Sequence, residues 1–222
     1  ICRAYPAERD GAGYSAEIVD ILDGKRNKWF RPSDVSVAPD GSLLVADWYD
    51  PGVGGHAAGD LGRGRLFRVT PTGQGEKYTT PKFDFTSAKG CVEALKNPNY
   101  AVRYMAWTAL TEMGDKAQGE LQSLAKDANP RYRARALWLL GKMDGNGQKT
   151  VDQALADDDA DIRCVAVRLG RELAAAKTEI NTAALLKAAA ADKSPAVRRE
   201  CAIALADLNP DNRAQRWAKL AS

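Results

Sequence analysis

The sequence predicts a mixed fold, in which an N-terminal β segment at residues 1–85 is followed by an all-α solenoid at residues 86–222. Two observations predict this division. Before residue 86 the chain holds most of its glycines and aromatic residues, in short runs of alternating apolar and polar residues that are typical of strands. After it, the chain is rich in Ala, Leu, Lys, Arg and Glu at helical spacing, and one helical motif recurs four times.

Four runs in the first segment are predicted strands, and one dipeptide predicts a hairpin. The runs are AEIVDIL (16–22), DVSVAP (34–39), SLLVADW (42–48) and GRLFRVT (64–70). Asp40-Gly41 separates the second run from the third and tolerates the positive φ of a tight hairpin. Strand, tight turn, strand, longer loop and strand are the order found in a β-propeller blade. Because a partial propeller leaves open sheet edges, we expect the remaining blades to precede residue 1 in the same polypeptide.

The second segment repeats a helical unit. The aligned runs are AVRYMAWTAL (101–110), RYRARALWLL (131–140), DIRCVAVRLG (161–170) and AVRRECAIAL (196–205). Their shared arginines are separated by 30, 30 and 35 residues. A shorter helical run precedes each of them, so we predict about four helix pairs. No single pair of this size can bury its apolar face alone, which predicts a solenoid of stacked pairs.

Helix starts and core positions also follow from the repeat. Three dipeptides pair an N-cap residue with a proline at the first helical position: Asn97-Pro98, Asn129-Pro130 and Ser194-Pro195. Val102, Ala106 and Leu110 lie at i, i+4 and i+8, so they and their counterparts form one buried stripe. The last run, DNRAQRWAKLAS (211–222), predicts a further helix that begins a fifth unit.

The recurring arginines predict a structural ladder between the turns. Its members are Arg103, Arg133, Arg163, Arg198, Asp127, Asp157 and Asp192. Each guanidinium is expected to bond carbonyls and the acidic or amide residue in the turns of its own and the adjacent repeat. The alternative is a basic groove for an anionic partner. The ladder is favoured because every arginine of the series except the first has an aspartate six positions earlier.

Composition excludes several classes of function. The 32 basic and 29 acidic residues are interspersed and leave a net charge of +3, which argues against nucleic-acid binding. No apolar run is long enough to span a membrane. The four cysteines are far apart and form no CxxC or Cys/His cluster, so we expect free thiols and no metal site. The start, ICRAYPAERDG, lacks Met and any signal-like run, and we expect an internal or processed piece of a longer protein.

Two family resemblances follow from these motifs. From residue 90 to about 208, the D-x-x-x-x-V-R-x-x-A pattern resembles HEAT repeats of the short bacterial type, which also occur in bilin-lyase-like proteins. HEAT arrays serve as scaffolds and binding surfaces in unrelated systems, so this resemblance implies a fold more than a function.

The second resemblance is narrower. WFRPSDVSVAPDGSLLVADWYDPGVGGH…GD…GRGRLFRVTP, within residues 29–71, resembles the closing part of the propeller in putative membrane-bound dehydrogenases of planctomycetes and their relatives. Those proteins are similar to quinone-dependent sugar dehydrogenases, continue into HEAT-like repeats and commonly end in a cytochrome c domain. The resemblance implies quinone, calcium and haem c in the parent family, a downstream cytochrome-like domain, and a periplasmic or exported location. This chain contains no CxxCH, so it can attach no haem itself, and we expect no cofactor bound by this chain alone.

The loop after the third predicted strand holds the candidate catalytic site. His56, the one histidine, is a weak candidate for a general base, and Asp47, Asp50 and Asp60 are weak candidates for cofactor binding. Structural turns and packing between blades explain the same residues and are favoured. Arg31 and Arg65 could bind an anion, but pairing with nearby aspartates is favoured for them too.

Three functional hypotheses remain open. In the first, the chain is a fragment of an exported sugar-dehydrogenase-like redox protein, inactive alone, whose solenoid links the propeller to the missing electron-transfer domain. In the second, it is a HEAT-repeat protein-interaction module without catalytic activity, which binds a protein partner on the solenoid surface. The third and weakest is a bilin-lyase-like enzyme.

Overall fold

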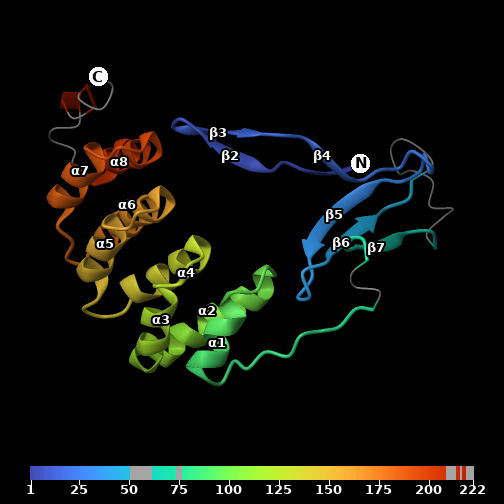
Figure 1. The fold of residues 1–222 in the computed structure, drawn as a ribbon, viewed down its shortest axis with the longest axis horizontal. Coiled ribbons are helices and arrows are strands. Elements are labelled where there is room, and N and C mark those ends of the chain that lie inside the picture. The colour runs from blue at the N-terminus through green and yellow to red at the C-terminus, as the bar shows by residue number, and fades with distance from the viewer. Residues whose placement is uncertain (51–61, 74–76, 209–213, 216, 219–222) are drawn as a thin grey trace.

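The computed structural model describes residues 1–50, 62–73 and 77–208, together with 214, 215, 217 and 218. Antiparallel strands come first and helices follow, so the predicted mixed fold is confirmed (Figure 1). No helix in these described ranges combines the length and apolar character needed to cross a membrane.

The first 22 residues form a long two-stranded ribbon. Its strands are β1 (Cys2–Ala4), β2 (Ala7–Asp10), β3 (Gly13–Ala16) and β4 (Val19–Leu22). β1 pairs with β4 and β2 pairs with β3, all antiparallel. Gly11 makes the turn at the tip with a φ of 57°. Only the last of these strands was predicted, because β2 and β3 are exposed along their whole length and show no apolar alternation.

A three-stranded sheet follows, in the order β5–β6–β7. Its strands are β5 (Pro32–Val37), β6 (Leu43–Asp47) and β7 (Arg65–Val69). The predicted turn at Asp40-Gly41 joins the first two, and Gly41 has a φ of 86°. The core of this sheet is small: Phe30 packs edge-on against Phe67 at 5.8 Å, and Val45 is fully buried.

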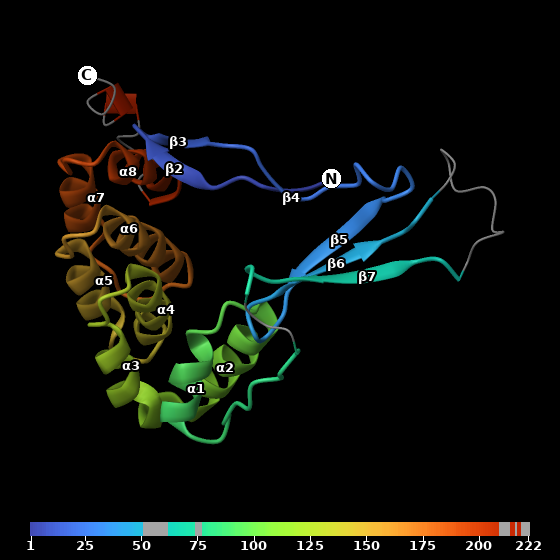
Figure 2. The same cartoon turned by 45° about the vertical axis from the view of Figure 1, so that its right-hand side comes forward.

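Eight α-helices and one 3₁₀ helix make up the described part of the solenoid. They are α1 (Ala88–Leu95), α2 (Tyr100–Met113), η2 (Gly114–Ala117), α3 (Gln118–Leu124), α4 (Pro130–Gly141), α5 (Gly147–Leu155), α6 (Ala160–Ala175), α7 (Thr182–Ala190) and α8 (Pro195–Leu208). They stack as four pairs. In both views of the ribbon the second helix of each pair, α2, α4, α6 or α8, lies on the side toward the β segment (Figure 1, Figure 2). We call the surface of these four helices the inner face.

One predicted helix start is wrong. The α2 helix is capped by Asn99, whose side chain accepts the Val102 amide, and not by Asn97 followed by Pro98. The Asn97 side chain instead accepts a hydrogen bond from the Asn99 amide at 2.8 Å, which shapes the turn before the helix. Asn129 caps α4 with Pro130 in its first turn, as the dipeptide predicts.

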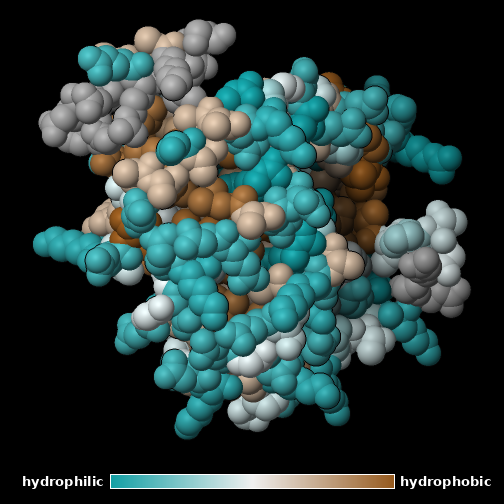
Figure 3. Space-filling view, turned by 60° about the vertical axis from the view of Figure 1, so that its left-hand side comes forward, coloured by the Kyte–Doolittle hydropathy of each residue, from teal (hydrophilic) through white to brown (hydrophobic). Residues whose placement is uncertain are grey.

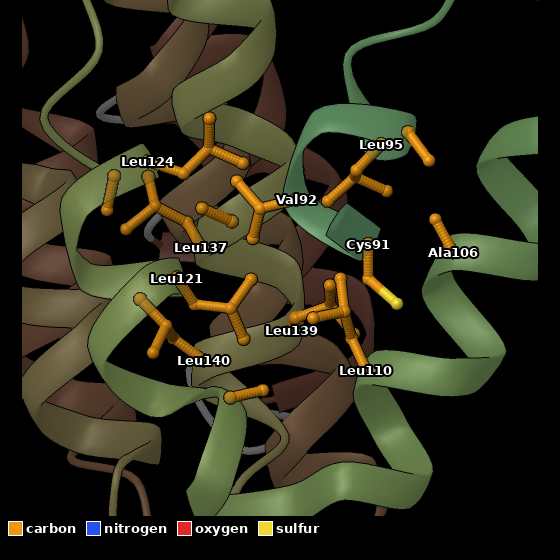
Figure 4. Close-up of a cluster of buried hydrophobic side chains, with 14 of the residues drawn as sticks. Cys91, Val92, Leu95, Ala106, Leu110, Leu121, Leu124, Leu137, Leu139 and Leu140 are labelled. Carbon is orange, nitrogen blue, oxygen red and sulfur yellow. The ribbon is translucent and has the colours of Figure 1, made fainter. Parts of the chain in front are cut away.

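Apolar side chains from consecutive helices form the core of the solenoid. Figure 4 shows residues of the first cluster pointing toward one another from α1, α2, α3 and α4. The predicted stripe of Val102, Ala106 and Leu110 is buried in it. Helices approach closely at Gly170, where a Cβ atom would lie 2.6 Å from a methyl group of Leu185. Small residues at such positions let the repeats stack at short distance.

The β segment contacts both ends of the solenoid. At the first repeat, the Asn97 side chain donates to the Pro39 carbonyl at 3.0 Å, and Asn99 donates to the Val37 carbonyl. Phe83 and Phe85 pack against the first core cluster. At the other end, the tip of the β2–β3 hairpin reaches α6 and α8 (Figure 2). The segment therefore bridges the first and last helix pairs.

Candidate functional site

Asp47, the first sequence candidate, has a structural environment. Its side chain is buried at the end of β6, where it accepts hydrogen bonds from the Arg31 amide at 2.7 Å and the Tyr49 amide at 3.0 Å. The Arg65 guanidinium binds it through two nitrogens, at 2.8 and 2.5 Å. Burial alone would raise the pKa of Asp47, but these hydrogen bonds outweigh burial and hold the pKa below its ordinary value. The carboxylate is fully engaged in joining β6, β7 and the preceding loop.

The structure describes only one of the other loop candidates. Asp50 is partly buried just past β6, while His56 and Asp60 lie outside the described residues. The Arg65 guanidinium that binds Asp47 also lies over the Tyr49 ring at 4.2 Å. In the part of the chain that the structure describes, no three His, Cys, Asp or Glu side chains are grouped to hold a metal ion.

The cysteines are free thiols within the fold. Cys91, Cys164 and Cys201 are buried and Cys2 is partly buried. Burial raises the pKa of the Cys91 and Cys164 thiols, which disfavours their reactive thiolate forms.

The arginines of the repeat connect neighbouring turns. Arg133 donates one nitrogen to the Asp127 and Ala128 carbonyls of its own turn and binds the Asp157 carboxylate of the next repeat at 3.0 and 3.1 Å. Arg163 repeats this arrangement one unit later and binds both oxygens of Asp192 at 2.7 and 3.0 Å. These bidentate pairs fix the spacing between repeats.

The two ends of this series differ from its middle. Arg198 donates to the Asp192 and Lys193 carbonyls of its own turn. Arg103 likewise donates to the Asn97 and Pro98 carbonyls, and its guanidinium stacks on the Tyr100 ring at 4.2 Å. The structure does not bring Arg103 and Asp127 into an ion pair.

The hairpin Ala7–Ala16 holds the last repeats through polar contacts, and we call these contacts the clasp. Arg9 pairs with Asp161 and lies 3.9 Å from the Cys164 sulfur. From the other side, Arg199 donates to the Ala12 carbonyl at 2.5 Å and lies 5.7 Å from the Tyr14 ring. No residue of β2 or β3 is buried, so the clasp depends on charge and hydrogen bonding rather than on apolar burial.

Beneath the clasp, Glu200 organises the inner face of α8. Its buried carboxylate accepts two hydrogen bonds from Arg168, at 2.7 and 2.9 Å, and one from Arg199 at 2.8 Å. The bonds from Arg168 lower the pKa of Glu200 to about 2, burial opposes this change, and Arg199 adds to the lowering. Both arginines at this end of the inner face therefore share one buried carboxylate.

The other end of the inner face contains an open pocket of about 310 Å³, which we call the inner pocket. Its lining residues are Leu95, Tyr100, Arg103, Tyr104, Trp107 and Arg135. Tyr100 and Tyr104 are 80% and 72% exposed, although the helix that carries them packs into the core. Figure 3 shows the molecule with its solenoid side brought forward, where the surface is mostly hydrophilic with smaller hydrophobic patches.

Positive charge gathers at the inner pocket without a matching carboxylate. Arg135 donates to the Leu95 carbonyl at 2.7 Å. Burial lowers the pKa of Arg135, and the neighbouring charges of Arg103 and Arg131 lower it further. Among the ion pairs within the described ranges, none involves these three arginines.

The sequence analysis missed the inner pocket, although a signal was present. Tyr100, Tyr104 and Trp107 lie at i, i+4 and i+7, which places them on one face of α2. That face differs from the one carrying the buried Val102, Ala106 and Leu110. An aromatic stripe beside the predicted core stripe was thus readable from spacing alone.

Comparison with protein families agrees with the helical architecture. The family model described as HEAT repeats matches residues 88–167. A solved structure, described as an engineered protein from the Northeast Structural Genomics Consortium, is similar to this chain. The match covers 60% of this chain and 69% of the engineered protein, at 18% sequence identity and a TM-score of 0.32. No curated protein matches the chain significantly. Residues 88–167 of this chain form HEAT repeats.

Proposed function

We propose that the solenoid is a protein-interaction scaffold that binds its partner on the inner face. One observation carries this proposal: α2 exposes Tyr100 and Tyr104 at a pocket lined by Arg103 and Arg135, on a helix that also exposes Met105 and whose buried residues belong to the core. Tyrosine, tryptophan, methionine and arginine are the residues enriched where proteins bind one another. HEAT repeats, found at residues 88–167, commonly serve this purpose.

Affinity capture from the source cell tests the proposal. The bait is the full chain. It is compared with an inner-face variant, Tyr104→Ala with Met105→Ala, and with a control variant outside the four inner-face helices, Lys126→Ser with Lys149→Ser. All four positions are exposed, so each variant should fold. We expect at least one protein that is retained by the wild type and the control and lost with the inner-face variant. Retention of every captured protein by the inner-face variant contradicts the proposal.

A second candidate is a segment of an exported, sugar-dehydrogenase-like redox protein. It is supported by the β5–β6–β7 sheet, which exposes apolar residues on both faces. Val35 and Leu66 are 50% and 68% exposed and point to opposite sides of the sheet, since Val35 aligns with Phe67, the neighbour of Leu66. A propeller blade has neighbouring blades on both faces, which would cover such residues.

The mass and absorption spectrum of the protein from its native source test this candidate. A much larger, exported species with a reduced cytochrome c band supports it, and would place propeller blades and the cytochrome-like domain in one polypeptide. Quinone or calcium dependence of that species would add support. A colourless species of 24.0 kDa contradicts it.

A further inference from the structure

The inner pocket has a composition that selects among protein partners. We propose that it binds an acidic peptide segment carrying one large apolar or aromatic anchor side chain. This inference rests on the proposed function and names the chemistry of the partner. It is argued from charge, from geometry at Arg103 and from the size of the pocket.

The charge of the pocket calls for carboxylates. Arg103 and Arg135 line the pocket, Arg131 lies one turn before Arg135 on α4, and none of the three is ion-paired within the described residues. At the other end of the inner face, Arg168 and Arg199 already bind the Glu200 carboxylate. A bound acidic segment would supply carboxylates to the arginines of the first repeats, as Glu200 supplies one to the arginines of the last repeat.

The arginines equivalent to Arg103 in the next two repeats each bind a carboxylate. In Arg133 and Arg163, one terminal nitrogen binds turn carbonyls, and the other two side-chain nitrogens bind both oxygens of an aspartate. Arg103 makes the same carbonyl contacts, but its remaining nitrogens form no ion pair in the described parts of the chain. Its guanidinium is already oriented by the turn and by Tyr100, so little conformational entropy is lost when it binds a carboxylate.

The pocket between these arginines suits one side chain. Its volume of about 310 Å³ lies at the small end of ligand pockets, and its floor and walls include Leu95, Tyr104 and Trp107. An aromatic or large aliphatic side chain can stack on these residues while flanking carboxylates reach the guanidinium groups. Such a combination of apolar anchor and charged rim is typical of peptide-binding hot spots.

Single-stranded nucleic acid is the competing ligand, because it also uses aromatic stacking and arginine. Nucleic-acid sites track a backbone along an extended positive groove. Here the arginines farther along the inner face, Arg168 and Arg199, are bound to the Glu200 carboxylate, and the net charge of the chain is only +3. The local cluster of charge therefore favours a short acidic peptide.

Fluorescence anisotropy with the full chain tests the proposal. The probe is a fluorescein-labelled peptide of glutamates around a central tryptophan. Two matched peptides replace the glutamates by glutamine or the tryptophan by alanine, and an oligouridylate of similar length is the fourth probe. We expect the acidic tryptophan peptide to bind at micromolar to submillimolar concentration, and each replacement to weaken binding roughly tenfold.

Two variants locate the binding. Tyr104→Ala and Arg131→Ser each should weaken binding of the acidic peptide about fivefold to tenfold, because Tyr104 lines the pocket and Arg131 adds positive charge beside it, and both residues are exposed. Tyr5→Ala and Lys126→Ser remove an exposed tyrosine and an exposed cation that do not line the pocket, and should leave affinity unchanged. Circular dichroism of each variant confirms that it is folded.

Several outcomes overturn the inference. They are no measurable binding of the acidic peptide, equal binding of the glutamine peptide, equal loss of affinity in the control variants, and tighter binding of the oligouridylate. If the peptide fails while affinity capture still yields a partner lost with the inner-face variant, the proposed function stands and only the acidic chemistry is wrong. If both fail, the inner face is not the interaction surface.

Discussion

The solenoid and the β segment are stabilised in different ways. Two clusters of buried side chains run through the helix pairs, and bidentate ion pairs join their turns. Residues 1–85 contribute only Phe30, Ala38 and Val45 to the buried apolar residues of the described chain. Ten large apolar or aromatic side chains in this segment are exposed: Ile1, Tyr5, Tyr14, Ile18, Val19, Trp29, Val35, Trp48, Leu66 and Tyr78.

This difference shows which region supplies the stability. Folding free energy comes mainly from buried apolar surface, so the solenoid is expected to fold on its own contacts. The β segment buries too little to do so and is held at its ends, by the Asn97 and Asn99 side chains at one repeat and the clasp at the other. Small sheets of this kind need packing against another element for stability.

The largest expected effect is the loss of a core leucine. Leu137→Ala removes a side chain that is buried in the first cluster and should lower the free energy of unfolding by about 3 kcal/mol. Leu66→Ala, the same chemical change on the exposed sheet, should cost less than about 0.5 kcal/mol. Urea denaturation followed by far-ultraviolet circular dichroism measures both. Similar losses in the two variants would refute the contrast between the regions.

The next largest effect concerns the ion pairs between turns. Arg163→Ala leaves the buried side of Asp192 and the carbonyls of Asp157 and Asp158 without their donor, so we expect a loss of roughly 3 kcal/mol. Arg131→Ala removes an exposed arginine from the neighbouring second helix and should change stability by less than about 0.5 kcal/mol. A thermal shift no larger for Arg163→Ala than for Arg131→Ala would show that the ladder is not structural.

Acid should weaken the last repeats through Glu200. Its pKa falls from 4.5 to about 2 on folding, because the folded protein binds the carboxylate through Arg168 and Arg199. The resulting stabilisation is complete above about pH 4.5 and is lost as the pH falls toward about 2; it amounts to roughly 3 kcal/mol. Unfolding free energies measured between pH 6 and about pH 2.5 should fall less steeply for Glu200→Gln than for the wild type. Parallel curves would exclude this role for Glu200.

The smallest effect on global stability is expected at the clasp. Arg9→Ala removes the ion pair with Asp161, whose side chain is mostly exposed. The free energy of unfolding should fall by less than about 1 kcal/mol. Its effect is local: amides of Ala7–Ala16 should exchange with deuterium faster, and those of α6 and α8 should change little. Added salt should accelerate exchange of this hairpin in the wild type, because the contacts are charged. Unchanged exchange of the hairpin in Arg9→Ala would mean that other contacts hold it.

The sequence predicted the solenoid well because its information is repeated. The arginine at 30- to 35-residue spacing and the stripe of Val102, Ala106 and Leu110 each occur four times in related form, so one misplaced cap at Asn97 did not disturb the architecture. The strands β2 and β3 were not predicted because they are exposed along their whole length and show no apolar alternation, and β1 is only three residues long.

Prediction of the site was poorer for a physical reason. The loop around Asp47 attracted attention because its acids and histidine are chemically reactive types, yet the structure shows the Asp47 carboxylate fully occupied by Arg65 and two amides. The inner pocket depends on which arginines lack a carboxylate, and that depends on contacts between repeats. Sequence spacing places Arg103 in the ladder with the other arginines. Spacing alone could not reveal that Arg103 lacks an ion pair with Asp127.

Hydroxyl-radical footprinting of the full chain, with and without a partner obtained by affinity capture, tests most directly whether the solenoid is the interacting region. Both regions carry exposed aromatic reporters: Tyr100 and Tyr104 on α2, and Trp29 and Trp48 in the β segment. We predict that the partner reduces oxidation of Tyr100 and Tyr104 and leaves Trp29 and Trp48 unchanged. Protection of the two tryptophans with no change on α2 would contradict the account and move the interaction surface to the β segment.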